Sequence, residues 1–182
     1  MKWDTLIGDA PLIAGALTFL SLVVAGWGLF ALHAWNRRNT ALQLIADWNP
    51  RTIDHRRAFE RAYPGCIDFH QGTAPAKEFT KAEAVKIYTA DPDTPEWALR
   101  FHVVELANFL EYVSLAYIHH TANREMIRQA LSHPMKQWHK LLEPFFDVVI
   151  ERRSYHLWQP YDDLVRNHLA RVPSISGSRP LP

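Results

Sequence analysis

The chain lacks the patterns on which many common enzymes and binding proteins depend. It has one cysteine in 182 residues, so it forms no internal disulfide and no Cys-x-x-Cys motif, which agrees with a reducing compartment. Its seven glycines form no phosphate-binding loop and no Gly-x-Ser-x-Gly elbow. The 20 Lys and Arg nearly balance the 19 Asp and Glu, which argues against a general nucleic-acid-binding protein. We therefore expect no cofactor and no nucleic-acid partner.

The most informative absence is the lack of charge near the N-terminus. No Lys, Arg, Asp or Glu occurs in residues 10–36, where residues 11–32 read PLIAGALTFLSLVVAGWGLFAL. A helix of this length spans roughly 33 Å, enough to cross a hydrocarbon core of about 30 Å. A buried core helix seldom runs this far without a charge, and the early Asp4 and Asp9 argue against a cleaved signal peptide. The sequence predicts a transmembrane helix at residues 11–35.

Basic residues flank this segment unevenly. Only Lys2 precedes it, whereas Arg37, Arg38, Arg56 and Arg57 follow it. Because cytoplasmic flanks carry the excess of positive charge, we expect residues 1–10 to form a short extracytoplasmic tail and residues 36–172 to lie in the cytoplasm. The four arginines are also candidates for contact with anionic headgroups of the bilayer, and a solvated helix face is the alternative.

A stripe of small residues runs along the predicted span. Ser21, Ala25 and Gly28 follow one another at helical spacing, which lets two such helices approach closely. This stripe is a candidate packing face for self-association. Small residues are also common in spans that face only lipid, and that alternative stays open.

Helical periodicity continues through the rest of the chain. Apolar residues from Ala41 to Trp48 predict that the first helix leaves the membrane and ends at Asn49-Pro50, followed by a short basic helix at residues 53–63. Capping and proline signals mark later helix starts at Thr80, Thr94-Pro95, Asn123, His133-Pro134 and Gln159-Pro160. A kink is expected at Pro144, which has no N–H to donate. Residues 173–182 are polar and rich in proline and are expected to form a disordered tail.

The longest cytosolic helix is predicted from Trp97 to His120. One apolar stripe consists of Val103, Leu106, Ala107, Leu110, Val113 and Tyr117. A second consists of Phe101, Val104, Phe109, Tyr112 and Leu115. A helix that is apolar around so much of its circumference should be central, with the others packed around it. No strand-like alternation occurs, so the predicted fold is all-α: one transmembrane helix that continues into a cytosolic helical bundle.

Two polar groups are candidates for chemistry. Asn108 and Glu111 share a face of the central helix, and a buried carboxylate there needs a partner such as Arg152 or Arg153. A polar brace between helices is the favoured interpretation over a catalytic carboxylate. A metal site through His102 and neighbouring residues is disfavoured, because no second His-x-x-Glu set accompanies the first.

Four segments of the chain together resemble one family. They are residues 40–49 (TALQLIADWN), 105–112 (ELANFLEY), 138–146 (WHKLLEPFF) and the pair Arg152-Arg153. With the preceding span, they resemble the bacterial family known as domain of unknown function 4760. Its members show a Leu-Asn-aromatic-aromatic-Glu core in the central helix, which Asn108, Phe109 and Glu111 match and Leu110 does not. The resemblance implies one N-terminal span and a cytosolic helical domain, but no activity.

These observations support three hypotheses about function. The leading one is a single-pass protein of the bacterial inner membrane whose helical domain binds another protein, as a scaffold, sensor or accessory subunit, or binds a second copy. An alternative is an anchored phage-defence or superinfection-exclusion factor, which rests on association alone. The least favoured is an enzyme or metal-binding bundle that uses Glu111 or His102, since no catalytic constellation is recognised.

Overall fold

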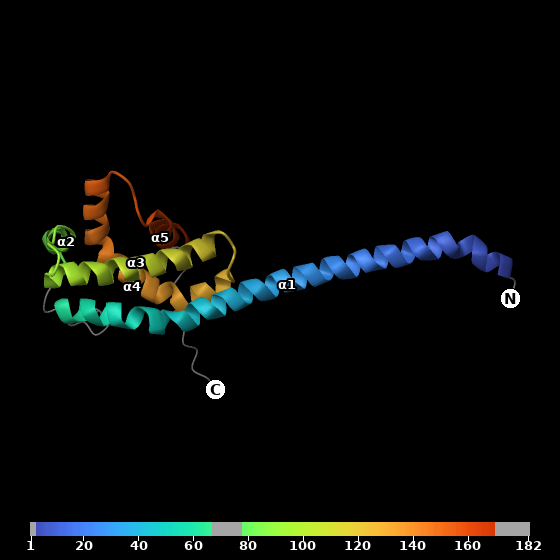
Figure 1. Cartoon of the computed structure of the whole chain (residues 1–182), viewed down its shortest axis with the longest axis horizontal. Coiled ribbons are helices and arrows are strands. Elements are labelled where there is room, and N and C mark those ends of the chain that lie inside the picture. The colour runs from blue at the N-terminus through green and yellow to red at the C-terminus, as the bar shows by residue number, and fades with distance from the viewer. Residues whose placement is uncertain (1–2, 67–77, 170–182) are drawn as a thin grey trace, which may run out of the picture.

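A computed structural model describes residues 3–66 and 78–169 of the chain, with side chains from Ala14 onward. Every regular element within these ranges is helical, as predicted. The elements are α1 (Trp3–Ala62), α2 (Lys81–Tyr88), α3 (Pro95–Ile118), α4 (Arg124–Arg153), α5 (Gln159–Asp163) and the π-helical turn η2 (Leu164–Leu169). The N-terminal part of α1 projects far from a compact domain that the rest of α1 and the other helices form (Figure 1). The expected tail at residues 173–182 lies outside the described residues.

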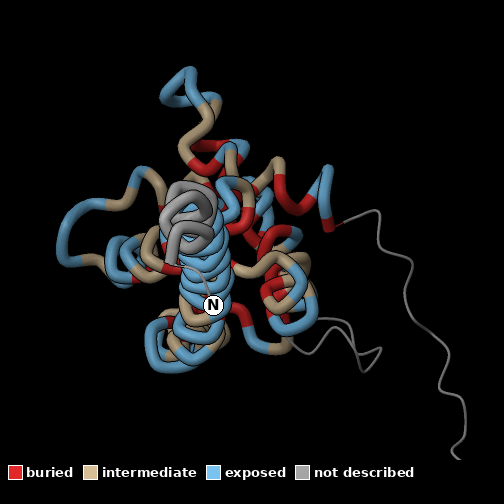
Figure 2. The backbone as a smooth tube through the Cα atoms, turned by 90° about the vertical axis from the view of Figure 1, so that its right-hand side faces the viewer, coloured by how far each residue is buried: buried red, intermediate tan, exposed pale blue. Residues whose placement is uncertain are grey.

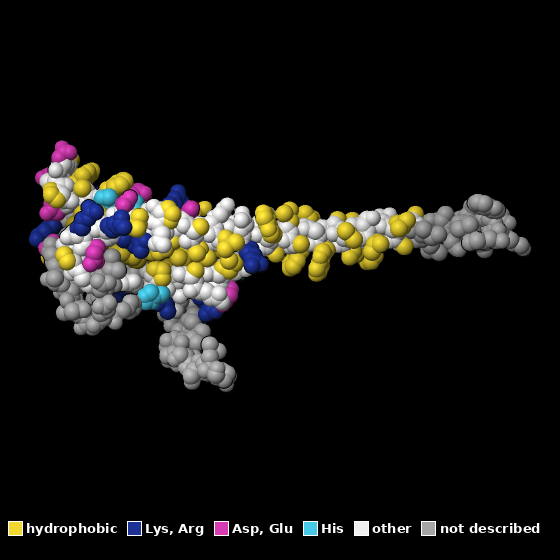
Figure 3. All heavy atoms as spheres, turned by 90° about the horizontal axis from the view of Figure 1, so that it is seen from below, with side chains coloured by type: hydrophobic (Ala, Val, Ile, Leu, Met, Phe, Trp, Pro, Cys, Tyr) yellow, Lys and Arg dark blue, Asp and Glu magenta, His cyan; other side chains and the backbone are white. Residues whose placement is uncertain are grey.

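The projecting part of α1 is apolar and packs against nothing. All side chains from Ala14 to Asn36 are exposed, and Trp27 reaches 74% exposure. Thr18 and Ser21 donate hydrogen bonds to carbonyls four residues earlier, at 2.9 and 2.8 Å, so their hydroxyls are satisfied within the helix. Apolar side chains recur along its described length in Figure 3. Within the described residues, α1 alone is long and apolar enough to cross a membrane.

The helical domain begins where this segment ends. The backbone N–H of Asn123, between α3 and α4, donates to the carbonyl of Arg37 at 2.9 Å. Farther along α1, the ring of Trp48 lies 6.0 Å from that of Phe109. Because later residues of α1 meet earlier residues of α3, the two helices are antiparallel. Viewed from the N-terminal end, buried residues gather between the helices of the domain (Figure 2).

One helix boundary was predicted wrongly. Helix α1 does not end at Asn49-Pro50 and restart at residue 53; it continues through Pro50 to Ala62. Pro50 and Ala46, whose carbonyl loses its usual N–H donor, are both exposed, so water can take the place of that donor. On either side, Leu44 and Phe59 are 3% and 1% exposed. Burial on both sides therefore holds the helix together across the proline.

Helix α4 contains two prolines, Pro134 and Pro144. As at Pro50, the helix continues through Pro134. The chain does not start a new helix at His133-Pro134, because Leu131 and Met135 are buried on both sides of Pro134 and hold one continuous helix. Pro144, where a kink was expected, also lies inside α4, and the helix changes direction along its length (Figure 1). Figure 1 shows the C-terminal part of α4 turned away from its N-terminal part.

The prediction for α3 is confirmed on one face and wrong on the other. All six residues of the first stripe are buried, and they pack against α1, α4 and the C-terminal helices. In the second stripe only Phe109 is buried, whereas Phe101 and Tyr112 are 58% and 52% exposed. Helix α3 is therefore covered on one side only. Its exposed side carries Trp97, Phe101, Tyr112 and Leu115, which we call the outer face of α3.

Candidate functional site

A cleft of about 380 Å³ opens at the N-terminal end of the outer face of α3. It lies where the end of α2, helix α3, the C-terminal part of α4 and the loop after α4 meet. Its lining consists of Tyr88, Trp97, Arg100, Phe101, Val104, Asn108, Phe145, Val149, Arg153, Leu157 and Trp158. We call it the aromatic cleft, because rings form much of its wall. Its volume falls within the range of small-molecule sites.

The floor of the cleft is closed by buried side chains. Helix α4 ends at Arg153 and is capped by Ser154, whose left-handed backbone (φ 58°) turns the chain, so that Trp158 packs back against α3. Trp158 is 3% exposed, and its ring lies 5.1 Å from that of Phe146. Its indole N–H donates to the Oδ1 of Asn108 at 3.1 Å. The one polar atom of this indole is thereby satisfied, and the floor is buried and apolar.

Two arginines flank the cleft, and both contact Tyr88. The guanidinium of Arg100 donates to the carbonyl of Tyr88 at 2.9 Å and lies 4.9 Å above its ring and 5.3 Å above that of Trp97. Arg153 donates to the hydroxyl of Tyr88 at 3.3 Å and to that of Tyr155 at 3.2 Å. No carboxylate lines the cleft, and within the described part of the chain neither arginine forms an ion pair. The cleft therefore carries uncompensated positive charge.

The four residues of the predicted polar brace do not form a buried ion pair. Asn108, Arg152 and Arg153 are exposed, and Glu111 is half-buried. Among the described residues, no ion pair reaches Glu111, whose pKa is raised by its partial burial. The prediction of a buried brace is wrong because these residues flank the exposed side of α3 and the end of α4. Asn108 and Arg153 instead belong to the aromatic cleft.

The four predicted membrane-surface arginines occupy two different places. Arg37 and Arg38 lie directly after the projecting segment. Arg56 lies 18 residues farther along a continuous helix, roughly 27 Å away. Its guanidinium stacks over Trp48 at 4.9 Å and donates to Asn49 at 2.7 Å, so α1 itself engages it. Contact with headgroups stays a prediction, and the geometry favours Arg37 and Arg38 for it over Arg56 and Arg57.

The small-residue stripe stays a prediction as well. Ser21, Ala25 and Gly28 are all exposed on the projecting segment. A Cβ added at Gly28 would meet nothing within 4 Å, so the helix surface there is open.

His102 pairs with a residue that the sequence analysis did not connect with it. The Nδ1 atoms of His55 on α1 and His102 on α3 share one hydrogen bond at 2.9 Å. Partial burial is the main cause that lowers the pKa of His102, and His55 and Arg61 add to it against the opposing effect of Asp54. Only one of the two rings can donate in this bond, so protonation of both breaks it. The described residues contain no group of three or more His, Cys, Asp or Glu placed to hold a metal ion.

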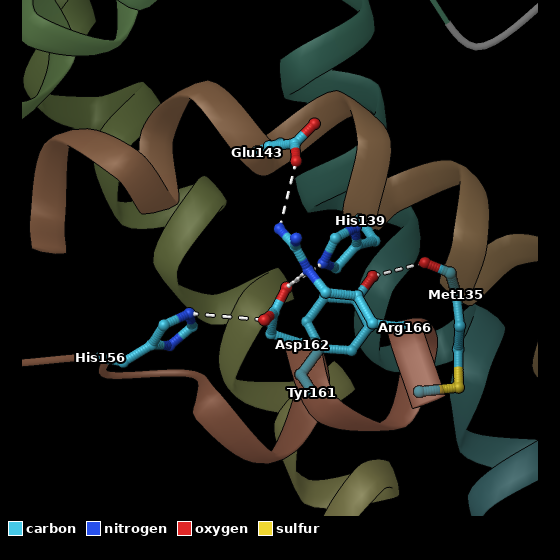
Figure 4. A network of polar contacts seen from close by, with 7 residues as sticks. All are labelled: Met135, His139, Glu143, His156, Tyr161, Asp162 and Arg166. Atoms are coloured by element: carbon cyan, nitrogen blue, oxygen red, sulfur yellow. Dashed lines mark hydrogen bonds and ion pairs between the residues drawn. The ribbon is translucent and has the colours of Figure 1, made fainter. Parts of the chain in front are cut away.

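Sequence reasoning also missed a polar network between α4, α5 and η2 (Figure 4). Asp162 accepts hydrogen bonds from His139 at 2.7 Å and from Arg166 at 2.6 Å, and Arg166 reaches Glu143 at 3.3 Å. Burial alone would raise the pKa of Asp162, but these hydrogen bonds together outweigh it and hold the pKa below its ordinary value. Nearby, the buried Tyr161 donates to the carbonyl of Met135 at 2.6 Å.

This network fixes the position of the last helical turns. It ties α5 and η2 to α4, next to the loop that carries Trp158 into the aromatic cleft. The sequence did hold one signal for it, because His139 and Glu143 both lie in the segment WHKLLEPFF that carried the family resemblance. Their partners Asp162 and Arg166 lie about 20 residues later, and no local pattern connects the two segments.

The chain matches the family described as Domain of unknown function (DUF4760) over residues 16–168, and it therefore belongs to this family. The match confirms the resemblance inferred from the sequence. It begins within the projecting part of α1 and ends in η2, so it takes in both the apolar segment and the helical domain. No curated protein and no solved structure matches the chain.

Proposed function

We propose that this protein is a single-pass protein of the bacterial inner membrane that holds a helical interaction domain at the cytoplasmic surface. The observation that carries this proposal is the apolar, fully exposed segment of α1. From Ala14 to Asn36 it is roughly 34 Å long, against a hydrocarbon core of about 30 Å. Eleven large apolar side chains along it are at least half exposed, which a water-soluble protein rarely tolerates in one continuous surface.

The charge on either side of the segment supports the orientation. Arg37 and Arg38 follow the apolar stretch directly, at the point where the domain begins. Because such positive charge is usually retained in the cytoplasm, it favours a cytoplasmic domain and an N-terminus outside. Because α1 continues unbroken from the apolar segment into the domain, no flexible linker separates the two. The domain is thus held in one direction relative to the bilayer.

The outer face of α3 is the surface we assign to a protein partner. It carries Trp97, Phe101, Tyr112 and Leu115 on one side of the helix, with exposed fractions from 36% to 58%. Aromatic residues at the centre of such a face supply much of the energy of protein interfaces. No described helix covers it.

Reporter fusions test the anchoring and the orientation. Alkaline phosphatase, which is active only outside the cytoplasm, should be active when fused to the N-terminus. Green fluorescent protein, which matures in the cytoplasm, should fluoresce at the C-terminus. The opposite pattern would reverse the proposed orientation. A cytoplasmic result at both ends would contradict the proposal that α1 crosses the membrane.

Photocrosslinking in native membranes tests the partner surface. A photoreactive residue at Tyr112, on the outer face of α3, should yield a discrete crosslinked protein. The matched control is Ala130, which is also exposed but lies on α4 and not on the outer face of α3. Identical crosslinks from both positions, or none from Tyr112, would contradict the assignment of this face.

A further inference from the structure

We propose that the aromatic cleft binds a small free carboxylic acid with an apolar or aromatic body. This inference goes beyond the anchoring and the partner surface and needs neither to hold, and Trp97 and Phe101 belong to both the cleft and the outer face of α3. It rests on three features of the cleft, which are its closed apolar floor, its two arginines, and its place at the end of the domain far from the apolar segment.

The floor and walls suit an apolar body of limited size. Phe145, Val149 and Trp158 are 1%, 2% and 3% exposed, so the floor is part of the core and closed from behind. Phe101 stands at the rim with 58% of its side chain exposed. An apolar group placed between rim and floor would cover apolar surface that now faces water. Removing that surface from water favours binding. The volume of about 380 Å³ limits the ligand to a small molecule or one or two side chains.

The charge of the cleft selects an anion. Arg100 is half-buried, and its position over Tyr88 and Trp97 is set by stacking and by its bond to the Tyr88 carbonyl. Arg153 is held through the hydroxyl of the same tyrosine. A half-buried guanidinium such as that of Arg100 usually meets a carboxylate, and here no lining residue supplies one. A ligand carboxylate at the mouth of the cleft would supply that missing charge by charge-assisted hydrogen bonds.

Lipid of the surrounding bilayer is a poor candidate for this anion. Helix α3 runs antiparallel to α1, and its first turns lie beside the C-terminal end of α1, where Ala58, Leu99 and His102 line one hollow. Ala58 lies 21 residues after Arg37, which corresponds to about 31 Å along the helix. The cleft therefore opens near the end of the domain opposite the projecting segment, where Figure 1 places α2. A diffusible acid reaches this position, whereas a headgroup held in the bilayer does not.

The test uses the full chain in detergent and two matched probes. The first probe is 3-(4-fluorophenyl)propionate, and the second is its neutral amide, which has the same body without the charge. Binding is followed by ¹⁹F NMR line broadening during titration. We expect saturable binding of the acid in the millimolar range or tighter, and at least fivefold weaker binding of the amide.

Substitutions then locate the bound acid. Arg100→Gln and Arg153→Gln should each weaken binding of the acid about tenfold, the effect of losing a charge-assisted hydrogen bond. The matched control is Arg152→Gln, which removes an exposed charge next to Arg153 that does not line the cleft, and binding should then stay within twofold. If Arg100→Gln fails to fold, the test rests on Arg153→Gln and its control Arg152→Gln, because both of these residues are exposed.

Any of three results would overturn the inference. The first is the absence of saturable binding of the acid to the folded protein. The others are equal binding of the acid and the amide, and an equal loss of affinity for the acid in the Arg152→Gln and Arg153→Gln variants. A blocked peptide, acetyl-Phe-Asp-amide, provides the last arm. Tighter binding of this peptide than of the free acid would assign the cleft to an acidic segment of a partner protein and would exclude the small-molecule role.

Discussion

Charge placed in the apolar segment of α1 should release the protein from the membrane. Nine Leu, Val and Phe residues lie between Ala14 and Asn36, and together they favour insertion by about 3 to 5 kcal/mol. One arginine near the middle of a span costs about 3 kcal/mol, and two cost about 5 to 7 kcal/mol. A single Val24→Arg change should therefore leave a mixed population. The pair Leu20→Arg and Val24→Arg should abolish insertion.

Flotation of membranes in a density gradient measures this effect without confusion from aggregates, which sediment instead. The matched control is the pair Leu42→Arg and Ala46→Arg, which has the same spacing on α1 but lies in the domain. Both control side chains are exposed, so the change should cost the domain little and the control should float with the parent. Flotation of the Leu20 and Val24 double variant with the membranes would refute the proposal that the bilayer holds this segment.

Three further predictions concern the helical domain. Asp162→Asn keeps an acceptor oxygen but removes the negative charge that His139 and Arg166 share, and it should lower the free energy of unfolding by about 2 kcal/mol, whereas Asp163→Asn beside it should change it by less than about 0.5 kcal/mol. Because the folded chain lowers the pKa of Asp162, this stabilisation is present above the unfolded pKa of about 3.9 and is lost as the pH falls through the folded value. Equal urea unfolding curves for Asp162→Asn and Asp163→Asn would contradict the network. The folded chain also lowers the pKa of His102, so its contribution is complete above the unfolded pKa of about 6.5 and is lost as the pH falls through the lower folded value. His102→Gln should reduce the difference in melting temperature between neutral and mildly acidic buffer. The control His119→Gln should leave that difference unchanged. If His102→Gln also leaves it unchanged, the pair of His55 and His102 is not the source of the pH dependence. Trp138→Ala should cost about 3 to 5 kcal/mol, because this side chain is 2% exposed and its ring lies 5.5 Å from that of Phe59; a loss below about 1 kcal/mol in thermal unfolding would show that the core closes around the gap.

Local signals in the sequence predicted the elements of the fold well. Thr80, Thr94 and Asn123 were expected to begin helices, and each accepts a hydrogen bond from the backbone N–H three residues later. These caps are readable because both partners lie within one turn of each other. The buried stripe of α3 was readable for a similar reason, since one face of a helix repeats at a short, fixed spacing.

Prolines showed where local rules stop. Pro50 and Pro134 were expected to end or start helices, but each lies inside a longer one. A proline in a helix costs about 3 kcal/mol, and burial of large apolar side chains on both sides can exceed that. Whether it does so depends on which helices lie opposite, and that is a property of the tertiary structure.

The sequence by itself determined the all-α class, the apolar segment that projects from the domain, and membership of the family. These properties follow from composition, short-range spacing and motif order, which do not require knowledge of distant contacts. Only the tertiary structure decided which side of α3 is covered, which residues meet Asp162, and that Arg100 and Arg153 flank one aromatic cleft. The two arginines are 53 residues apart in the chain, and the fold brings both to Tyr88. The two arginines lie close together only because α2, α3, α4 and the loop after α4 pack against one another. No periodic pattern within any one of these segments predicts that packing.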